Sequence, residues 1–194
     1  ELFRYEQDLL DEIERWKRRW FINWVLFQYQ SGCRCHESHN LHIGDTQIHV
    51  RPNGKVKGIL EIAPTTKTGR RTVIMNGNTL RKVKSHLNKG IKLRNAEIGR
   101  HNQLVISGAI KDFKWRSQCE IPLMESARKD DFLLMNPFLE GSKVYSIEHI
   151  RGWMNDVLNK CFFDRRFTLH SLRSTHITHA LLRGYRTRVV ADNV

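Results

Sequence analysis

The sequence has little cysteine and no long hydrophobic run. Four cysteines occur among the 194 residues, and they are widely scattered. They are too few for a disulfide scaffold and suit a reducing compartment. The longest apolar run, residues 20–27, contains Asn23 and is far shorter than a membrane span, so we expect no membrane partner. The N-terminal residues are acidic and amphipathic, which is not the pattern of a secretory signal peptide.

Acidic residues are also scarce. The chain has 20 Asp and Glu against 33 Lys and Arg, a formal net charge of +13. Residues 1–14 hold six of the acids and one base, so residues 15–194 carry 32 bases against 14 acids, a net charge of +18. A field of this sign attracts polyanions. The alternative is a basic protein whose charge serves only its solubility.

The remaining composition favours one globular domain, because a hydrophobic fraction of 40% is enough for a core. Apolar residues at helical spacing predict helices at 5–19, 20–30, 78–87, 147–158, 168–184 and 188–194. A short helix is expected between a break at Gly32 and Leu41. Ser146 and Thr168 are the expected N-caps, and Gly184 the expected stop. The residues of helix 168–184 expected to face the core are Leu169, Leu172, Ala180 and Leu181.

Strand signals occupy the middle of the chain. Alternating or apolar stretches at 46–51, 58–63 and 71–75 are separated by turn residues at 52–55 and 65–70. They predict a small three-stranded antiparallel sheet within a mostly helical α+β fold. Residues 89–120 are basic and mixed in pattern, and we treat them as a possible insertion.

Several side chains stand out as candidates for chemistry. His170 and Arg173 are three residues apart, so they project from one side of a helix and could together grip and protonate a phosphate oxygen. Arg34 follows a glycine break, and Glu37 is placed to steady its guanidinium. Lys67 stands in the hairpin between the second and third strands. For the His–Arg pair the alternative is a surface helix that carries both, and for the lysine a solvated hairpin tip.

A group of sulfur and nitrogen ligands near the first glycine break offers a zinc site as an alternative. Its members are Cys33, Cys35, His36, His39 and His42. A structural zinc site pairs two spaced ligand sets, and Cys-x-Cys-His is not a usual spacing. We therefore expect no metal here.

Taken in order, the motifs resemble the catalytic domain of tyrosine recombinases, the phage-type integrases. The segments that carry the resemblance are Ser31-Gly32-Cys33-Arg34-Cys35-His36-Glu37, Lys67-Thr68-Gly69, His170-Ser171-Leu172-Arg173-Ser174-Thr175, His179 and Arg188-Val189-Val190. His179 falls in the place of the family's second histidine. Each motif alone is common by chance, but the ordered set is specific.

The resemblance implies a role for each candidate residue. Arg34 and Arg173 would clamp the scissile phosphate, and Glu37 would support them. His170 would act as general acid and base, and Lys67 would protonate the 5′-oxygen leaving group. No metal or other cofactor is implied, because the arginines supply the positive charge.

The resemblance also implies the reaction and its partners. Members cut and rejoin double-stranded DNA through a 3′-phosphotyrosine intermediate, and they act as homotetramers at synapsis. A cytoplasmic, nucleoid-associated protein of a bacterial or phage host cell is implied. The alternatives are a catalytically inactive DNA-binding regulator of the same fold and an enzyme like a type IB topoisomerase.

The sequence departs from the family pattern at the nucleophile. The family's tyrosine lies farther along the chain than the 21 residues that follow Arg173 here, and Tyr185 is too close to replace it. We therefore expect residues 1–194 to be a catalytic domain truncated before the nucleophilic tyrosine, without the N-terminal DNA-clamp domain. Such a fragment would bind a phosphate but would not cut DNA.

Overall fold

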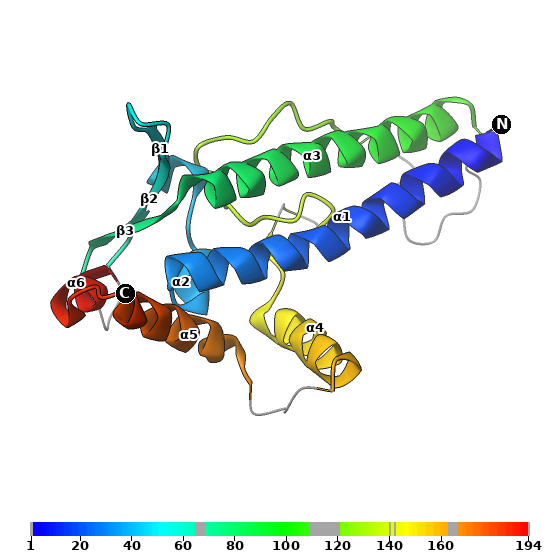
Figure 1. Cartoon of the computed structure of the whole chain (residues 1–194). Helices are drawn as coiled ribbons and strands as arrows, with labels where there is room; N and C mark the ends of the chain where they lie inside the picture. Colours follow the sequence, from blue (N-terminus) through cyan, green and yellow to red (C-terminus); the bar gives the residue numbers. More distant parts are fainter. Residues whose placement is uncertain are drawn as a thin grey trace.

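The computed structural model of the chain describes residues 2–64, 69–108, 121–139, 141, 143–162 and 167–193. Its helices are α1 (Leu2–Ser31), α2 (Cys35–His39), the 3-10 helix η1 (Ile43–Asp45), α3 (Gly77–Ile106), α4 (Ile147–Lys160), α5 (Leu169–Leu182) and α6 (Thr187–Asn193). Its strands are β1 (Thr46–Val50), β2 (Val56–Ile62) and β3 (Arg71–Asn76). The predicted α+β fold, mostly helical with a three-stranded antiparallel sheet, is confirmed (Figure 1).

Two 30-residue helices, α1 and α3, lie side by side and antiparallel, and the sheet lies at the end where α3 begins (Figure 1). The prediction of separate helices at 5–19 and 20–30 is wrong, because α1 is continuous. The helix contains no glycine or proline, and one face is buried from Leu9 to Phe27. The buried residues of that face are Leu9, Ile13, Trp16, Trp20, Trp24 and Phe27.

The helix predicted at 78–87 is much longer than expected and continues to Ile106. The side-chain oxygen of Asn76 caps its start by accepting a hydrogen bond from the Asn78 N–H at 2.9 Å. Gly90 lies inside α3, where a Cβ would stand 2.6 Å from the Trp16 ring. This close approach lets α3 run on along α1, so residues 89–106 are helical. The rest of the possible insertion, residues 109–120, lies outside the described residues.

The sheet has the strand order β1-β2-β3, and both pairs are antiparallel. Leu60 of β2 is opposite Thr46 on one side and Val73 on the other. β2 begins two residues before the expected start at Gly58, and the other two strands agree with the prediction to within one residue. Leu60 and Val73 belong to the same buried cluster as Leu80 of α3, which attaches the sheet to the helix pair.

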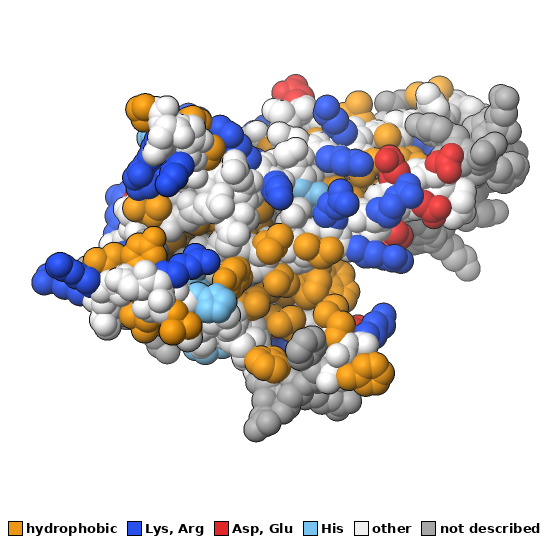
Figure 2. All heavy atoms as spheres, viewed as in Figure 1, with side chains coloured by type: hydrophobic (Ala, Val, Ile, Leu, Met, Phe, Trp, Pro, Cys, Tyr) orange, Lys and Arg blue, Asp and Glu red, His pale blue; other side chains and the backbone are white. Residues whose placement is uncertain are grey.

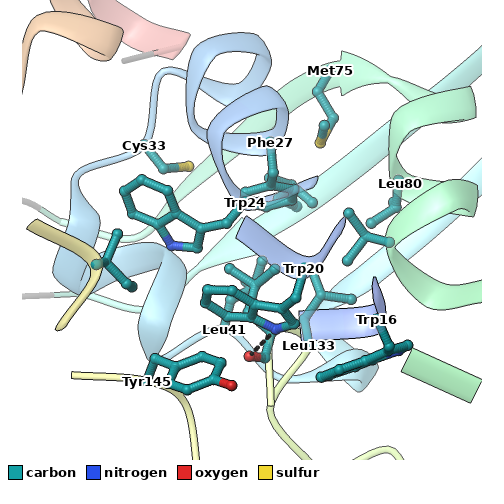
Figure 3. Close-up of a cluster of buried hydrophobic side chains, with 14 of the residues drawn as sticks. Trp16, Trp20, Trp24, Phe27, Cys33, Leu41, Met75, Leu80, Leu133 and Tyr145 are labelled. Atoms are coloured by element: carbon teal, nitrogen blue, oxygen red, sulfur yellow. Dashed lines mark hydrogen bonds between the residues drawn. The ribbon is translucent and has the colours of Figure 1, made fainter. Parts of the chain in front are cut away.

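Tryptophans of α1 form the centre of the core (Figure 3). Trp20 Nε1 donates a hydrogen bond to the Leu134 carbonyl at 3.2 Å, which attaches the segment after α3 to α1. The Trp20 ring also meets Tyr145 edge-on, with 4.8 Å between centroids. Because Tyr145 directly precedes the N-cap of α4, this contact holds that helix against α1.

The predicted helix ends of α4 and α5 agree with the structure. Ser146 is the N-cap of α4, and its Oγ accepts a hydrogen bond from the His149 N–H at 3.1 Å. Thr168 is the N-cap of α5, and its N–H donates to Ser171 Oγ at 2.9 Å. Gly184, with a φ of +81°, follows the last turn of α5.

The apolar face predicted for α5 is only partly correct. Leu169 is buried and Leu172 packs against the core, but Leu181 is 41% exposed. The reason is that α5 meets the end of α1 through His176 and His179. None of the described helices combines the length and hydrophobicity needed to cross a membrane.

Candidate functional site

The site begins at the glycine that ends α1. The Gly32 N–H donates to the Gln28 carbonyl at 3.0 Å, and its φ of +64° turns the chain sharply. An L-residue with a side chain rarely adopts this conformation, which explains a glycine at the break. The turn makes Arg34 the N-cap of α2, so its backbone and side chain both face the first turn of that helix.

A buried carboxylate, that of Glu37, organises the charges around the turn. Its Oε1 accepts from Arg34 Nη1 at 2.9 Å and from Arg71 Nη1 at 2.8 Å. Its Oε2 accepts from the Arg34 N–H at 2.8 Å and from Arg71 Nη2 at 2.7 Å. Burial raises the pKa of this carboxyl, but the hydrogen bonds from Arg71 and Arg34 outweigh it and lower the pKa to about 2. Glu37 is therefore ionised at neutral pH.

Arg173 enters the same region from α5. Its Nη1 donates a hydrogen bond to the carbonyl of Gly32, two residues before Arg34. Burial lowers the pKa of the Arg173 guanidinium, and the neighbouring charge of Arg34 lowers it further. The structure therefore brings Arg34, Glu37 and Arg173 together, although Arg173 is far from the other two in sequence.

The cluster carries an excess of positive charge. Arg34, Arg71 and Arg173 contribute three charges and Glu37 offsets one, which leaves +2 at neutral pH. The Arg34 side chain is 32% exposed, so its guanidinium is accessible from solvent. Partly buried guanidiniums bind carboxylate and phosphate oxygens more strongly than fully solvated ones, because less water screens their charge.

The two remaining predicted site residues are His170 and Lys67. His170 is exposed at the start of α5, one turn before Arg173 and on the same side of the helix. Lys67 lies outside the described residues.

Histidines fasten α5 to the end of α1. His176 Nδ1 lies 2.8 Å from the Tyr29 carbonyl, and its ring packs against Gly32. His179 Nδ1 lies 2.6 Å from the Tyr29 hydroxyl. Burial lowers the pKa of His176, with a smaller opposing effect from its backbone hydrogen bond. These contacts set the position of α5, and so of Arg173, relative to the Gly32 turn.

The sequence analysis missed Arg71. A signal for it exists, because Arg71, Val73 and Met75 alternate along β3 and share a face. Val73 and Met75 are buried. An arginine on the buried face of a strand needs an anionic partner, and here that partner is Glu37.

The residues weighed as zinc ligands have other surroundings. His39 Nε2 accepts a hydrogen bond from Trp24 Nε1 at 3.2 Å, and the His42 ring stacks on Phe132. Cys33 is buried, and burial raises its pKa to about 11, so its thiol is protonated at neutral pH. Within the described part of the chain, no three Cys, His, Asp or Glu side chains group around a possible metal position.

Comparison with known proteins yields similarity of structure without similarity of sequence. No protein-family model matches the chain, and no curated protein matches it in sequence. A crystal structure of the site-specific recombinase XerH, bound to its difH substrate in a pre-cleavage complex, matches with a TM-score of 0.55 and 13% identity. The match covers 97% of this chain and 44% of XerH.

Two further solved structures match less well. One is XerA recombinase, with 17% identity and a TM-score of 0.49, and the match covers 96% of this chain and 53% of XerA. The other is the integrase of transposon Tn1549 in complex with circular intermediate DNA, with 14% identity and a TM-score of 0.49, and the match covers 97% of this chain and 54% of that integrase. The chain thus spans about half the length of these proteins. Over nearly all of its own length, it has the fold seen in the site-specific recombinase XerH.

Proposed function

We propose that this chain is the catalytic domain of a tyrosine recombinase, which cuts and rejoins double-stranded DNA at specific sites through a 3′-phosphotyrosine intermediate. One observation carries the proposal: Arg34 and Arg173, from opposite ends of the sequence, meet in one half-buried cluster with surplus positive charge. The fold shared with XerH supports the same class of enzyme.

The proposed chemistry is transfer of a DNA phosphoryl group. Negative charge on the non-bridging oxygens is stabilised in the transition state by the planar guanidiniums of Arg34 and Arg173. Arginine suits this role better than lysine, because it stays charged and binds two oxygens at once. In the proposal, His170 acts as general acid and base, and Lys67 donates the proton to the departing 5′-oxygen.

The charge distribution supports DNA as the partner. Lys and Arg side chains spread across much of the face in Figure 2, whereas most of the acidic side chains visible there lie towards the N-terminal end of α1. Exposed basic residues come from separate elements, among them Arg81 and Lys82 of α3 and Arg51 and Lys55 beside the β1–β2 turn. A homotetramer on two duplexes is the assembly we propose for the active enzyme.

The test measures covalent protein–DNA adducts. We assign the nucleophile to none of these 194 residues, so the assay uses the full natural protein that carries this sequence and a suicide duplex that traps the adduct. We expect Arg173→Ala to lower the rate of adduct formation about a hundredfold, because one transition-state donor contributes on the order of 3 kcal/mol. Duplex affinity should change by only a few fold.

The matched control is Arg183→Ala, which removes an exposed arginine just after the same helix. We expect it to retain adduct formation. Undiminished adduct formation by Arg173→Ala would refute the proposal that Arg34 and Arg173 together clamp the scissile phosphate. An absence of adducts in the wild-type protein would instead favour a DNA-binding regulator that has lost catalysis.

A further inference from the structure

We infer that Arg71 is a positioning residue of the phosphate clamp: it holds the Glu37 carboxylate, and through it fixes the orientation of the Arg34 guanidinium. This inference rests on the proposed function, because it assigns a task to a residue beside the proposed site. It adds a third arginine, from the sheet, that the sequence analysis did not identify.

The geometry of the carboxylate supports the inference. Each oxygen of Glu37 has two donors, and Arg71 supplies one donor to each. Such a bidentate pair fixes the plane of the carboxylate. Arg34 binds the same carboxylate with one side-chain nitrogen and its own backbone N–H, so the plane that Arg71 fixes also determines where the Arg34 side chain lies.

Arg71 and Arg34 differ in solvent exposure, and this difference indicates different roles. The Arg71 side chain is 12% exposed, whereas that of Arg34 is 32% exposed and that of Glu37 is fully buried. A phosphate arriving from solvent therefore reaches Arg34 before Arg71. Arg71 acts through Glu37 rather than on the phosphate itself.

The charge balance gives a second reason for Arg71. A pair of Arg34 and Glu37 alone would be neutral and would attract an anion weakly. The second guanidinium on Glu37 makes the group of three net positive. Arg34 therefore keeps its attraction for a phosphate while it remains held in place.

Arg71 also connects the sheet to the clamp. It is the first residue of β3 and is opposite Ile62 of β2. Its bond to Glu37 joins the start of that strand to α2. A disturbance at this end of the sheet is thus transmitted to Arg34 through two short hydrogen bonds.

The test compares Arg71→Met with Arg70→Met in the full natural protein. Arg70 is the exposed neighbour of Arg71, so its replacement removes the same charge without touching Glu37. We expect Arg71→Met to slow adduct formation about ten- to a hundredfold, the range that loss of an orienting group costs in metal centres. The rate of adduct formation in Arg70→Met should match that of the wild type. Duplex affinity should fall by the same factor in both variants, because each loses one positive charge.

A pH profile distinguishes positioning from a general loss of structure. The groups that face Glu37 are Arg34 and Cys33 of its own loop, Arg71 of β3 and Arg173 of α5. Removing Arg71 takes away a side-chain donor that lowers the pKa of Glu37, so the pKa of Glu37 should rise and the rate in Arg71→Met should fall more steeply on acidification than the rate in Arg70→Met. Adding Glu37→Gln to Arg71→Met should remove that extra fall.

Arg71→Lys serves as the second variant, because it keeps the charge but lacks the planar pair of donors. We expect a rate between those of Arg71→Met and the wild type, measured where circular dichroism shows each variant to be folded. Adducts in the wild type with equal rates and pH profiles for Arg71→Met and Arg70→Met would overturn this inference alone. No adducts in the wild type would overturn the proposed function and this inference together.

Discussion

At the scale of single residues, Gly32 determines how closely α5 packs against the end of α1. A Cβ on Gly32 would stand 2.6 Å from the His176 ring, and its φ of +64° lies in the left-handed region. Its carbonyl receives the hydrogen bond from Arg173. The absence of a side chain at this position therefore permits both the turn and the close packing of α5.

We expect Gly32→Ala to lower the free energy of unfolding by about 2 to 5 kcal/mol, from the left-handed conformation together with overpacking. Gly54→Ala is the matched control, because Gly54 has a φ of +75° but nothing within 4 Å of its would-be Cβ. It should lose only the conformational part, about 1 to 2 kcal/mol. Urea unfolding measures both, and equal losses would show that the His176 contact is unimportant.

The sequence predicted part of this site. Arg34 and Arg173 could be related because the resemblance to a family orders their motifs, and Glu37 because it follows Arg34 by one helical turn. Arg71 could not be related to them in this way. Alternation along a strand tells which face a residue occupies, but the partner on that face depends on how the sheet packs against α2.

At the scale of elements, the turn residues predicted the three strands well, but the lengths of the two long helices, α1 and α3, were predicted poorly. The change in composition near Trp20 suggested two helices, although nothing there interrupts hydrogen bonding and α1 continues. Gly90 weakened the pattern of α3, because glycine disfavours helices by about 1 kcal/mol. Packing against Trp16 favours helix at that position, and a sequence pattern contains no such contact.

Two of the three glycines of α3, Gly90 and Gly99, give a test of this explanation. Gly90→Ala places a Cβ 2.6 Å from the Trp16 ring, and we expect it to destabilise the fold by about 1 to 3 kcal/mol. Gly99→Ala, with nothing within 4 Å, should stabilise it by about 0.5 to 1 kcal/mol through helix propensity. Thermal unfolding of both variants supplies the comparison. A stabilising Gly90→Ala would contradict the packing argument.

At the scale of the whole molecule, buried ionisable groups couple stability to pH. Burial lowers the pKa of His39 to about 4, with minor contributions from Glu148 and His36. Burial also lowers the pKa of His86 to about 4. The unfolded chain takes up protons on these histidines near pH 6.5, before the folded chain does, so acid favours the unfolded state.

We therefore expect the free energy of unfolding to fall as the pH decreases from 6.5 to 4, where the histidines contribute. Glu37, whose folded pKa is about 2, should add a further loss from pH 4.5 downward, because its ionised form is stabilised in the fold. Urea titrations between pH 7.5 and 4 measure this. His39→Gln should reduce the slope, and replacing the exposed His49 should leave it unchanged. A flat profile would contradict the burial of these histidines.

The joining of α5 to the end of α1 also has a consequence during protein synthesis. Arg173, His176 and His179 reach Gly32 and Tyr29 across 141 to 150 positions of the chain. A ribosome that adds about 5 to 20 residues per second takes roughly 7 to 30 s to translate that interval. Throughout that time the nascent polypeptide holds Arg34 without Arg173, so the proposed pair of phosphate-binding arginines is complete only after translation has passed α5.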